Sequence, residues 1–287
     1  MRVAAIQMRS GMRPEANLAA LAPLIAEAKA QGADYALTPE VTFVFPENRD
    51  GLAEVAGPWE DNPSIAGAAE LAKTHALWLH IGSLAVLLPD GYFANRSVLF
   101  TPDGSIAATY DKIHLFDANL PGLKAYRESA TYRGGDQAKV IPVAGVNLGM
   151  TICYDVRFAS LYATLANAGA DVIAVPAAFT VPTGQAHWEV LLRARAIETG
   201  CYIVAAAQGG THENGRSTYG HSMIVDPWGE IIVQANGDAP AVIIAEVYLN
   251  KVSDARSRVP SLANTRAFSL SVNDRGASFG AERQISK

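Results

Sequence analysis

The feature that most constrains the fold of this chain is the alternation of short apolar runs with longer segments whose apolar residues have helical spacing. Residues 2–8 are almost continuously apolar, which is typical of a buried strand, and in residues 14–30 the apolar side chains recur every three or four positions. Gly32 then provides a stop signal for the helix. Strands and helices that alternate in this way predict an α/β protein with helices packed on sheets.

The alternation continues along the rest of the chain. We expect further strands at residues 35–37, 77–84, 97–100, 105–110, 147–152, 171–175, 201–207, 222–225, 230–234 and 241–247, and further helices at residues 64–75, 158–168 and 186–199. The sequences Thr101-Pro102-Asp103-Gly104 and Asp226-Pro227-Trp228-Gly229 are typical of turns that join two antiparallel strands. Such hairpins favour two sheets covered by helix layers over a single Rossmann sheet. No glycine-rich phosphate-binding motif follows a strand, so no nucleotide cofactor is expected.

Composition limits the classes of partner. The chain has 287 residues, of which 49% are hydrophobic, and its net charge is −5. This charge, without a dense Lys/Arg run, argues against a nucleic-acid partner, and no apolar run reaches the length of a membrane span. We expect a cytoplasmic protein with one domain at residues 1–270 and a polar tail at residues 271–287.

The chain has two cysteines, Cys153 and Cys201. They are too far apart and too few for a disulfide framework or a clustered metal site. Neither His187 nor His221 stands at a metal-ligand spacing from a second histidine, so the sequence predicts no metal and no other cofactor. At least one thiol is therefore available for chemistry.

Cys153 follows an apolar strand and precedes a polar turn that leads into a helix. A side chain at such a strand tip lies near backbone N–H groups that can stabilise a negative oxygen, as in a nucleophile elbow. Position alone also allows a small buried residue, because free cysteines are often buried. Cys201 lies inside an apolar run and is expected in the core.

Glu40 and Lys112 each have an ordinary interpretation when taken alone. Glu40 follows a strand and is itself followed by apolar residues, a setting that suits a general base as well as a cap. Lys112 closes the strand after the first hairpin, where a surface lysine is the common case.

Taken together, the segments around these residues resemble the nitrilase superfamily of carbon–nitrogen hydrolases. The resemblance extends from about residue 2 to residue 270. It is carried by Leu37-Thr38-Pro39-Glu40, Tyr110-Asp111-Lys112-Ile113-His114, Ile152-Cys153-Tyr154-Asp155-Val156-Arg157-Phe158 and the blocks at residues 186–198 and 219–229. It implies a four-layer α-β-β-α sandwich that assembles as a homodimer or a larger homo-oligomer.

The resemblance also implies roles for individual residues. Cys153 would be the nucleophile, Glu40 the base and later the acid, and Lys112 with the Tyr154 N–H the stabilisers of the oxyanion. Glu128, in a segment similar to the one that carries a second glutamate in this superfamily, would orient the lysine or the substrate. The glycines and proline at residues 121–124 and 134–135 fit a loop that closes over the site, and they equally fit a plain surface loop.

The motif Cys-Tyr-Asp-x-Arg-Phe resembles the branch that contains omega-amidase and deaminated glutathione amidase. In that branch Arg157, Phe179 and Thr183 correspond to positions around the substrate, and an arginine suits a carboxylate. The position of Arg157 at the start of a helix also fits a salt bridge within the protein. The resemblance implies cleavage of a small linear amide, such as deaminated glutathione or a related carboxylate-bearing amide, to an acid and ammonia.

Four other functions remain open from the sequence. They are an omega-amidase acting on 2-oxo-acid amides, a nitrilase acting on nitriles, a non-catalytic ligand-binding member of the fold, and a Cys-His hydrolase of papain type with His221 as the base.

Overall fold

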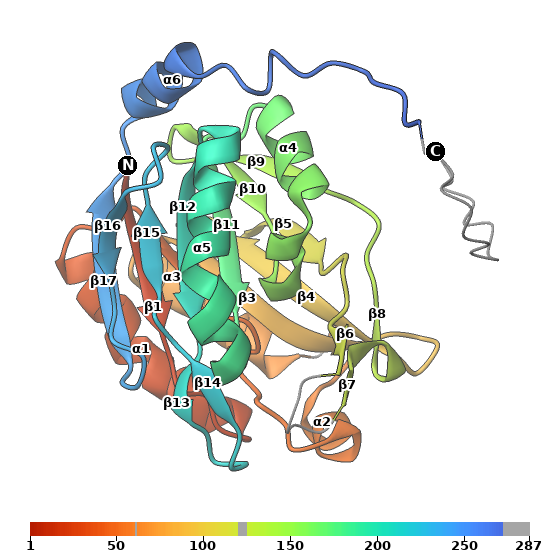
Figure 1. Ribbon diagram of the computed structural model, residues 1–287. Coiled ribbons are helices and arrows are strands. Elements are labelled where there is room, and N and C mark those ends of the chain that lie inside the picture. The colour runs from red at the N-terminus through yellow and green to blue at the C-terminus, as the bar shows by residue number, and fades with distance from the viewer. Residues whose placement is uncertain (61, 120–124, 272–287) are drawn as a thin grey trace, which may run out of the picture.

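Two mixed sheets packed face to face form the centre of the protein, and helices cover their outer faces (Figure 1). The computed structural model describes residues 1–60, 62–119 and 125–271. The expected tail, apart from its first residue, and the loop at residues 121–124 lie outside this part of the chain.

The first sheet has the strand order β17-β1-β2-β3-β4-β5, and β8 pairs with β4. Strands β1, β2 and β3 are parallel, whereas β17 pairs antiparallel with β1 and β4 pairs antiparallel with both β3 and β5. The bounds are β1 (Arg2–Gln7), β2 (Tyr35–Leu37), β3 (Trp78–Leu87), β4 (Phe93–Phe100), β5 (Ile106–Asp111), β8 (Tyr132–Arg133) and β17 (Ala241–Glu246).

The second sheet has the order β16-β15-β12-β11-β10-β9, with β10, β11 and β12 parallel and the other pairs antiparallel. The bounds are β9 (Lys139–Val143), β10 (Val146–Met150), β11 (Val172–Ala177), β12 (Tyr202–Ala207), β15 (Met223–Val225) and β16 (Ile231–Gln234). The central strands of each sheet are therefore parallel, and their carboxyl ends lie at the same edge of the sheet.

Helices α1 (Pro14–Ala30) and α3 (Pro63–Thr74) pack on the first sheet, and α4 (Ala159–Asn167) and α5 (Val181–Thr199) cover the second. These layers make the α-β-β-α sandwich that the resemblance implied (Figure 1). The remaining elements are α2 (Arg49–Val55), α6 (Leu249–Arg258), the strand pairs β6 (Asp117–Ala118) with β7 (Tyr126–Arg127) and β13 (Gly209–Thr211) with β14 (Ser217–Tyr219), and the 3-10 helices η1 (Glu128–Ala130) and η2 (Cys153–Arg157).

Strand β1 is buried on both of its faces. Val3 and Ala5 belong to the core that includes the second sheet, whereas Ala4 and Ile6 belong to the core shared with α1 and α3. Successive side chains of a strand point to opposite faces, so a strand covered on both faces is a continuous apolar run.

Several expected elements are confirmed. The helix at Pro14–Ala30 and the strand at Tyr35–Leu37 have the expected bounds, and both hairpin turns close with a backbone hydrogen bond, from the Gly104 N–H to the Thr101 carbonyl and from the Gly229 N–H to the Asp226 carbonyl. Helix α5 begins at Val181, five residues before the expected start, with Pro182 in its first turn. No helix in the described ranges combines the length and apolar character needed to cross a membrane.

Candidate active site

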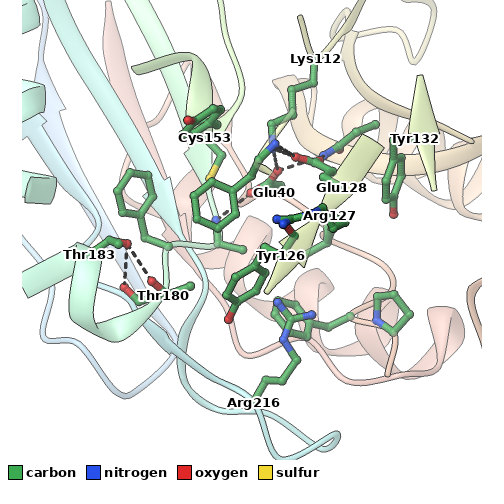
Figure 2. Close-up of a pocket in the computed structure, with 18 of the residues that line it drawn as sticks. Glu40, Lys112, Tyr126, Arg127, Glu128, Tyr132, Cys153, Thr180, Thr183 and Arg216 are labelled. Atoms are coloured by element: carbon green, nitrogen blue, oxygen red, sulfur yellow. Dashed lines mark hydrogen bonds and ion pairs between the residues drawn. The ribbon is translucent and has the colours of Figure 1, made fainter. Parts of the chain in front are cut away.

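The strand ends of both sheets bring the three motif residues together. Glu40 lies three residues beyond the end of β2, Lys112 directly follows β5, and Cys153 lies three residues beyond the end of β10. All three line one cavity of about 570 Å³ (Figure 2). The sequence therefore identified, from segments far apart in the chain, residues that the fold places in one pocket.

Cys153 occupies a strained backbone position at the start of η2. Its φ angle is +48°, in the left-handed region that residues other than glycine rarely adopt, and 8% of the residue is exposed. This sharp turn between β10 and η2 agrees with the expected elbow. The Tyr154 N–H lies in the first turn of η2, where helical N–H groups have no partner within the helix.

Asp155 connects this elbow to the segment that carries the lysine. Its carboxylate is fully buried and accepts hydrogen bonds from the Ile152 N–H (2.9 Å), the Tyr110 hydroxyl (2.7 Å) and the His114 N–H (3.0 Å). Oδ1, the oxygen that accepts from the His114 N–H, also lies 2.7 Å from Nδ1 of His114. Because Tyr110 and His114 flank Lys112, Asp155 fixes the lysine segment against the cysteine turn. No role for Asp155 was expected from the sequence.

Glu40 is buried, but its immediate partners are polar rather than apolar. Its Oε1 atom accepts hydrogen bonds from Nζ of Lys112 (2.8 Å) and Nδ2 of Asn95 (2.9 Å), and its Oε2 atom accepts one from the Ala178 N–H (3.0 Å). The groups in direct contact with the carboxylate are therefore these donors and not the apolar residues that follow Glu40. These three donors fix the carboxylate in one orientation.

Lys112 joins Glu40 to Glu128. The lysine side chain is 2% exposed, and Nζ lies 2.9 and 3.0 Å from the two oxygens of the Glu128 carboxylate (Figure 2). Glu128 also accepts hydrogen bonds from the Phe116 N–H (2.6 Å) and from Asn95 (3.1 Å). Burial alone would lower the pKa of Lys112, but Glu128 and Glu40 outweigh it and raise this pKa well above its usual value. The lysine is therefore a fixed cation.

The Cys153 thiol has the opposite electrostatic setting. Burial and the neighbouring Glu40 carboxylate raise the pKa of Cys153 well above its usual value, although Lys112 opposes the shift. A thiol in such surroundings is protonated at neutral pH. Attack by its sulfur requires a base that takes the proton, and Glu40 is close enough to influence the thiol.

The residues expected around the substrate also line the cavity, namely Tyr154, Arg157, Phe179 and Thr183. The guanidinium carbon of Arg157 lies 5.5 Å from the ring centre of Phe179 and 5.8 Å from that of Tyr154. Both of its Nη atoms lie 3.3 Å from Nδ1 of His187. In the described ranges no carboxylate lies within 4.0 Å of this guanidinium, so the salt bridge that could have explained Arg157 is not formed.

Five further residues line the cavity without an expected role: Phe45, Asn95, Tyr126, Arg127 and Arg216. Tyr126 and Arg127 directly precede Glu128 in the segment that carries the family resemblance. Phe45, Asn95 and Arg216 stand in no motif, and only the fold brings them to Glu40 and Cys153. Cys201 is fully buried, as expected. The described residues contain no group of three His, Cys, Asp or Glu side chains placed to hold a metal ion.

His221 has structural contacts outside the cavity. Its ring stacks on Tyr219 at 4.0 Å, and its carbonyl accepts a hydrogen bond from the Trp188 indole. It is not among the residues that line the pocket with Cys153. The structure therefore gives no support to a papain-type Cys153–His221 pair.

Comparisons with known proteins agree with the resemblance found in the sequence. A family model described as carbon-nitrogen hydrolase matches residues 2–257. A deaminated glutathione amidase from Yersinia enterocolitica is 40% identical over 92% of this chain and 92% of its own length.

Two solved structures extend the similarity to the fold. The Caenorhabditis elegans NitFhit protein has a TM-score of 0.84 and 35% identity over 92% of this chain, which spans 65% of that fusion protein. An amidase from Nesterenkonia sp. AN1, in a mutant that shows Michael addition of acrylamide at the active site cysteine, has a TM-score of 0.75 and 26% identity over 91% of this chain and 98% of its own. The chain therefore belongs to the carbon-nitrogen hydrolase family.

Proposed function

We propose that this protein is an amidase that cleaves a small linear amide through a covalent intermediate on Cys153. The observation that carries the proposal is the buried Lys112 cation, held by the carboxylates of Glu40 and Glu128 in the cavity that Cys153 also lines. A nucleophile, a carboxylate and a fixed cation are the parts that acyl transfer requires.

In the proposed reaction Glu40 carries the proton both when the acyl-enzyme forms and when it is hydrolysed. Glu40 takes the thiol proton while the Cys153 sulfur bonds to the amide carbon, and the carbonyl oxygen becomes an anion. When the C–N bond breaks, Glu40 gives this proton to the departing amine or ammonia. Water then attacks the thioester, Glu40 takes a proton from it, and the sulfur leaves and is reprotonated as the acid is released.

Lys112 and the Tyr154 N–H are the proposed stabilisers of the oxyanion. A fixed cation and a free N–H stabilise a developing negative charge without reorganising during the reaction. Glu128 would act on Lys112, because both oxygens of its carboxylate bind the ammonium, at 3.0 and 2.9 Å from Nζ. This arrangement restricts the position of Nζ and supports Glu128 as a positioning residue.

We further propose that the substrate carries a carboxylate on its acyl arm. Arg157 lies in the same cavity wall as Phe179 and Thr183, and its guanidinium has no carboxylate partner within the described residues. A planar guanidinium binds a carboxylate through two parallel hydrogen bonds. With a relative named as a deaminated glutathione amidase, this favours deaminated glutathione as the substrate. An omega-amidase substrate such as succinamate is the comparator.

The test measures the acid and the amine or ammonia released from deaminated glutathione, succinamate and butyramide. Wild type should hydrolyse deaminated glutathione and succinamate, which carry a carboxylate, faster than the neutral amide butyramide. It should hydrolyse deaminated glutathione faster than succinamate. Cys153→Ala should retain less than about a hundredth of the rate, whereas Cys201→Ala, the matched cysteine control, should affect stability rather than turnover. Equal rates for butyramide and the acids would refute carboxylate recognition.

Residues 1–270 are proposed to act as one hydrolase domain in the cytoplasm. The family match over residues 2–257 and a core that runs from Val3 to Val252 across both sheets support a single domain. Both cysteines are free. A thiol nucleophile works in a compartment that keeps cysteines reduced, which supports the cytoplasm.

A homodimer or larger homo-oligomer is also proposed, with a second copy of the chain packed on α5. Val190 and Ile197 of this helix are 67% and 54% exposed, and Trp228, 57% exposed, lies next to the glycine whose carbonyl binds Arg193 of α5. Ile197→Glu should lower the mass measured by light scattering to that of a monomer. Ile106→Glu, at an exposed position on β5, is the control, and an unchanged mass in Ile197→Glu would contradict this interface.

A further inference from the structure

The mouth of the cavity has an excess of positive charge that the proposed acyl-transfer machinery does not use. Besides Glu40, Lys112 and Glu128, its charged lining residues are Arg127, Arg157, Arg216 and Glu47. Lys112 is already paired with two carboxylates, and Arg127 donates to the Tyr126 carbonyl and to Asn119. Three guanidinium groups against one carboxylate favour an anionic ligand at this mouth.

Arg216 contacts different residues from Arg157. Its guanidinium carbon lies 4.8 Å from the ring centre of Phe45 and 5.8 Å from that of Tyr126, whereas Arg157 lies over Tyr154 and Phe179. Figure 2 shows Arg216 below Tyr126, on the side of the cavity away from Lys112. Within the described ranges no ion pair uses Arg216. The cavity thus has two separate guanidinium groups without a carboxylate partner.

The hairpin between β13 and β14 holds Arg216 in place. The His212 N–H donates to the Arg216 carbonyl (2.8 Å), and the Arg216 N–H donates to the side chain of Asn214 (3.0 Å). Asn214 in turn donates to the carbonyls of Phe45 and Pro46 at 3.0 and 3.1 Å. The His212 ring also stacks on Phe45 at 4.1 Å with an interplanar angle of 5°. The backbone that carries Arg216 is therefore fixed to the cavity wall before any ligand binds.

This wall begins at the residue that is proposed to protonate the leaving amine. Val41, Phe45, Pro46 and Glu47 follow Glu40 in the sequence, and all of them line the cavity. An amine that receives its proton from Glu40 leaves beside this segment, and Arg216 contacts the segment at Phe45. Arg157 lies instead on the wall assigned to the acyl arm.

We propose that Arg216 forms a second carboxylate-binding subsite, which recognises an acid on the amine side of the scissile amide. The inference rests on the proposed amidase function and assigns a residue to the amine side of its substrate. Deaminated glutathione, the substrate already proposed, is a secondary amide with one carboxylate on each side, and Arg216 would bind the acid of its dipeptide leaving group.

Two substrates that differ in a single charge test this subsite. Succinylglycine has a carboxylate on its amine side, and succinylglycinamide has a neutral amide at the same place. In wild type we expect a higher kcat/KM for succinylglycine. Arg216→Gln should reduce the ratio of the two kcat/KM values about tenfold, because a hydrogen bond to a charged group is lost. Arg49→Gln should keep the ratio, since Arg49 also lies over an aromatic ring, that of Tyr92, but does not line the cavity.

A binding measurement separates this inference from the proposed reaction. Calorimetry with Cys153→Ala, with and without Arg216→Gln, should show about tenfold weaker binding of succinylglycine in the double variant and a smaller change for succinylglycinamide. If both substrates are hydrolysed but Arg216→Gln lowers their two kcat/KM values equally, the proposed subsite is wrong and the amidase function stands. Charge-selective binding that depends on Arg216, without hydrolysis by wild type, would overturn the amidase function alone. Absence of both binding and hydrolysis would overturn both.

Discussion

Replacing Lys112 by Met removes the cation that two buried carboxylates share. Nζ lies 2.8 Å from Glu40 and 2.9 Å from Glu128, and at an effective dielectric constant of about 20 a pair of unit charges at such a distance attracts by about 6 kcal/mol before desolvation is subtracted. Breaking a buried pair by removing one partner costs about 3 to 5 kcal/mol. We expect the free energy of unfolding to fall by this amount, and kcat to fall by about 10² to 10³ through loss of oxyanion stabilisation.

The assay combines urea unfolding with steady-state kinetics at a temperature where the variant is folded. Lys251→Met is the matched control, because the Lys251 ammonium pairs with Asp226 but its side chain is 49% exposed, and ion pairs open to solvent contribute about 0 to 1 kcal/mol. In Lys112→Met with Glu128→Gln one of the two remaining carboxylates is neutral, so part of the stability should return while kcat stays low. A Lys112→Met protein whose free energy of unfolding lies within about 1 kcal/mol of wild type and which keeps a tenth of its kcat would contradict both roles of Lys112.

Three further changes have expected outcomes. Glu40→Gln should reduce kcat by about 10²-fold or more, because the base is lost, and kcat above a tenth of wild type would exclude Glu40 as the base. Asp155→Asn should lower kcat more than it changes KM, because Asp155 fixes the Cys153 turn without touching substrate; a change in KM alone would contradict this. Burial lowers the pKa of His80 from 6.5 to about 3, so the unfolded chain takes up a proton there that the folded protein does not. The free energy of unfolding should fall from pH 6.5 toward pH 3, by up to about 1.4 kcal/mol per pH unit, and His80→Gln should reduce that slope.

The sequence predicted those helices and strands in which buried apolar residues recur at the regular spacing of a helix or a strand. Helix α1 was predicted with its full bounds because Leu21, Ile25 and Ala28 bury one face of it. Helix α6 was not predicted, since only Val252 and Ala255 of its ten residues are buried and most of the rest are polar. Strand β13 contains two glycines, which have low strand propensity, and forms only through its pairing with β14.

The candidate site divides in a similar way. Glu40, Lys112 and Cys153 each stand in a short motif, so a family resemblance was enough to find them. Asn95 lies inside β4, and its interaction with both Glu40 and Glu128 depends on the pairing of β4 with its neighbours. Arg216 lies in an exposed hairpin whose position is fixed by Asn214. Contacts of this kind arise from tertiary structure, and one sequence has no periodic signal for them.

The most direct test of the central claim is to identify the covalent intermediate on Cys153. Wild-type protein is mixed with deaminated glutathione or succinamate, quenched in acid during turnover, digested and analysed by mass spectrometry, and a parallel reaction contains hydroxylamine to trap the acyl group. We expect an acyl thioester on the peptide that contains Cys153, none on the peptide that contains Cys201, and formation of the hydroxamate. Turnover without an adduct on Cys153 and without hydroxamate would contradict it.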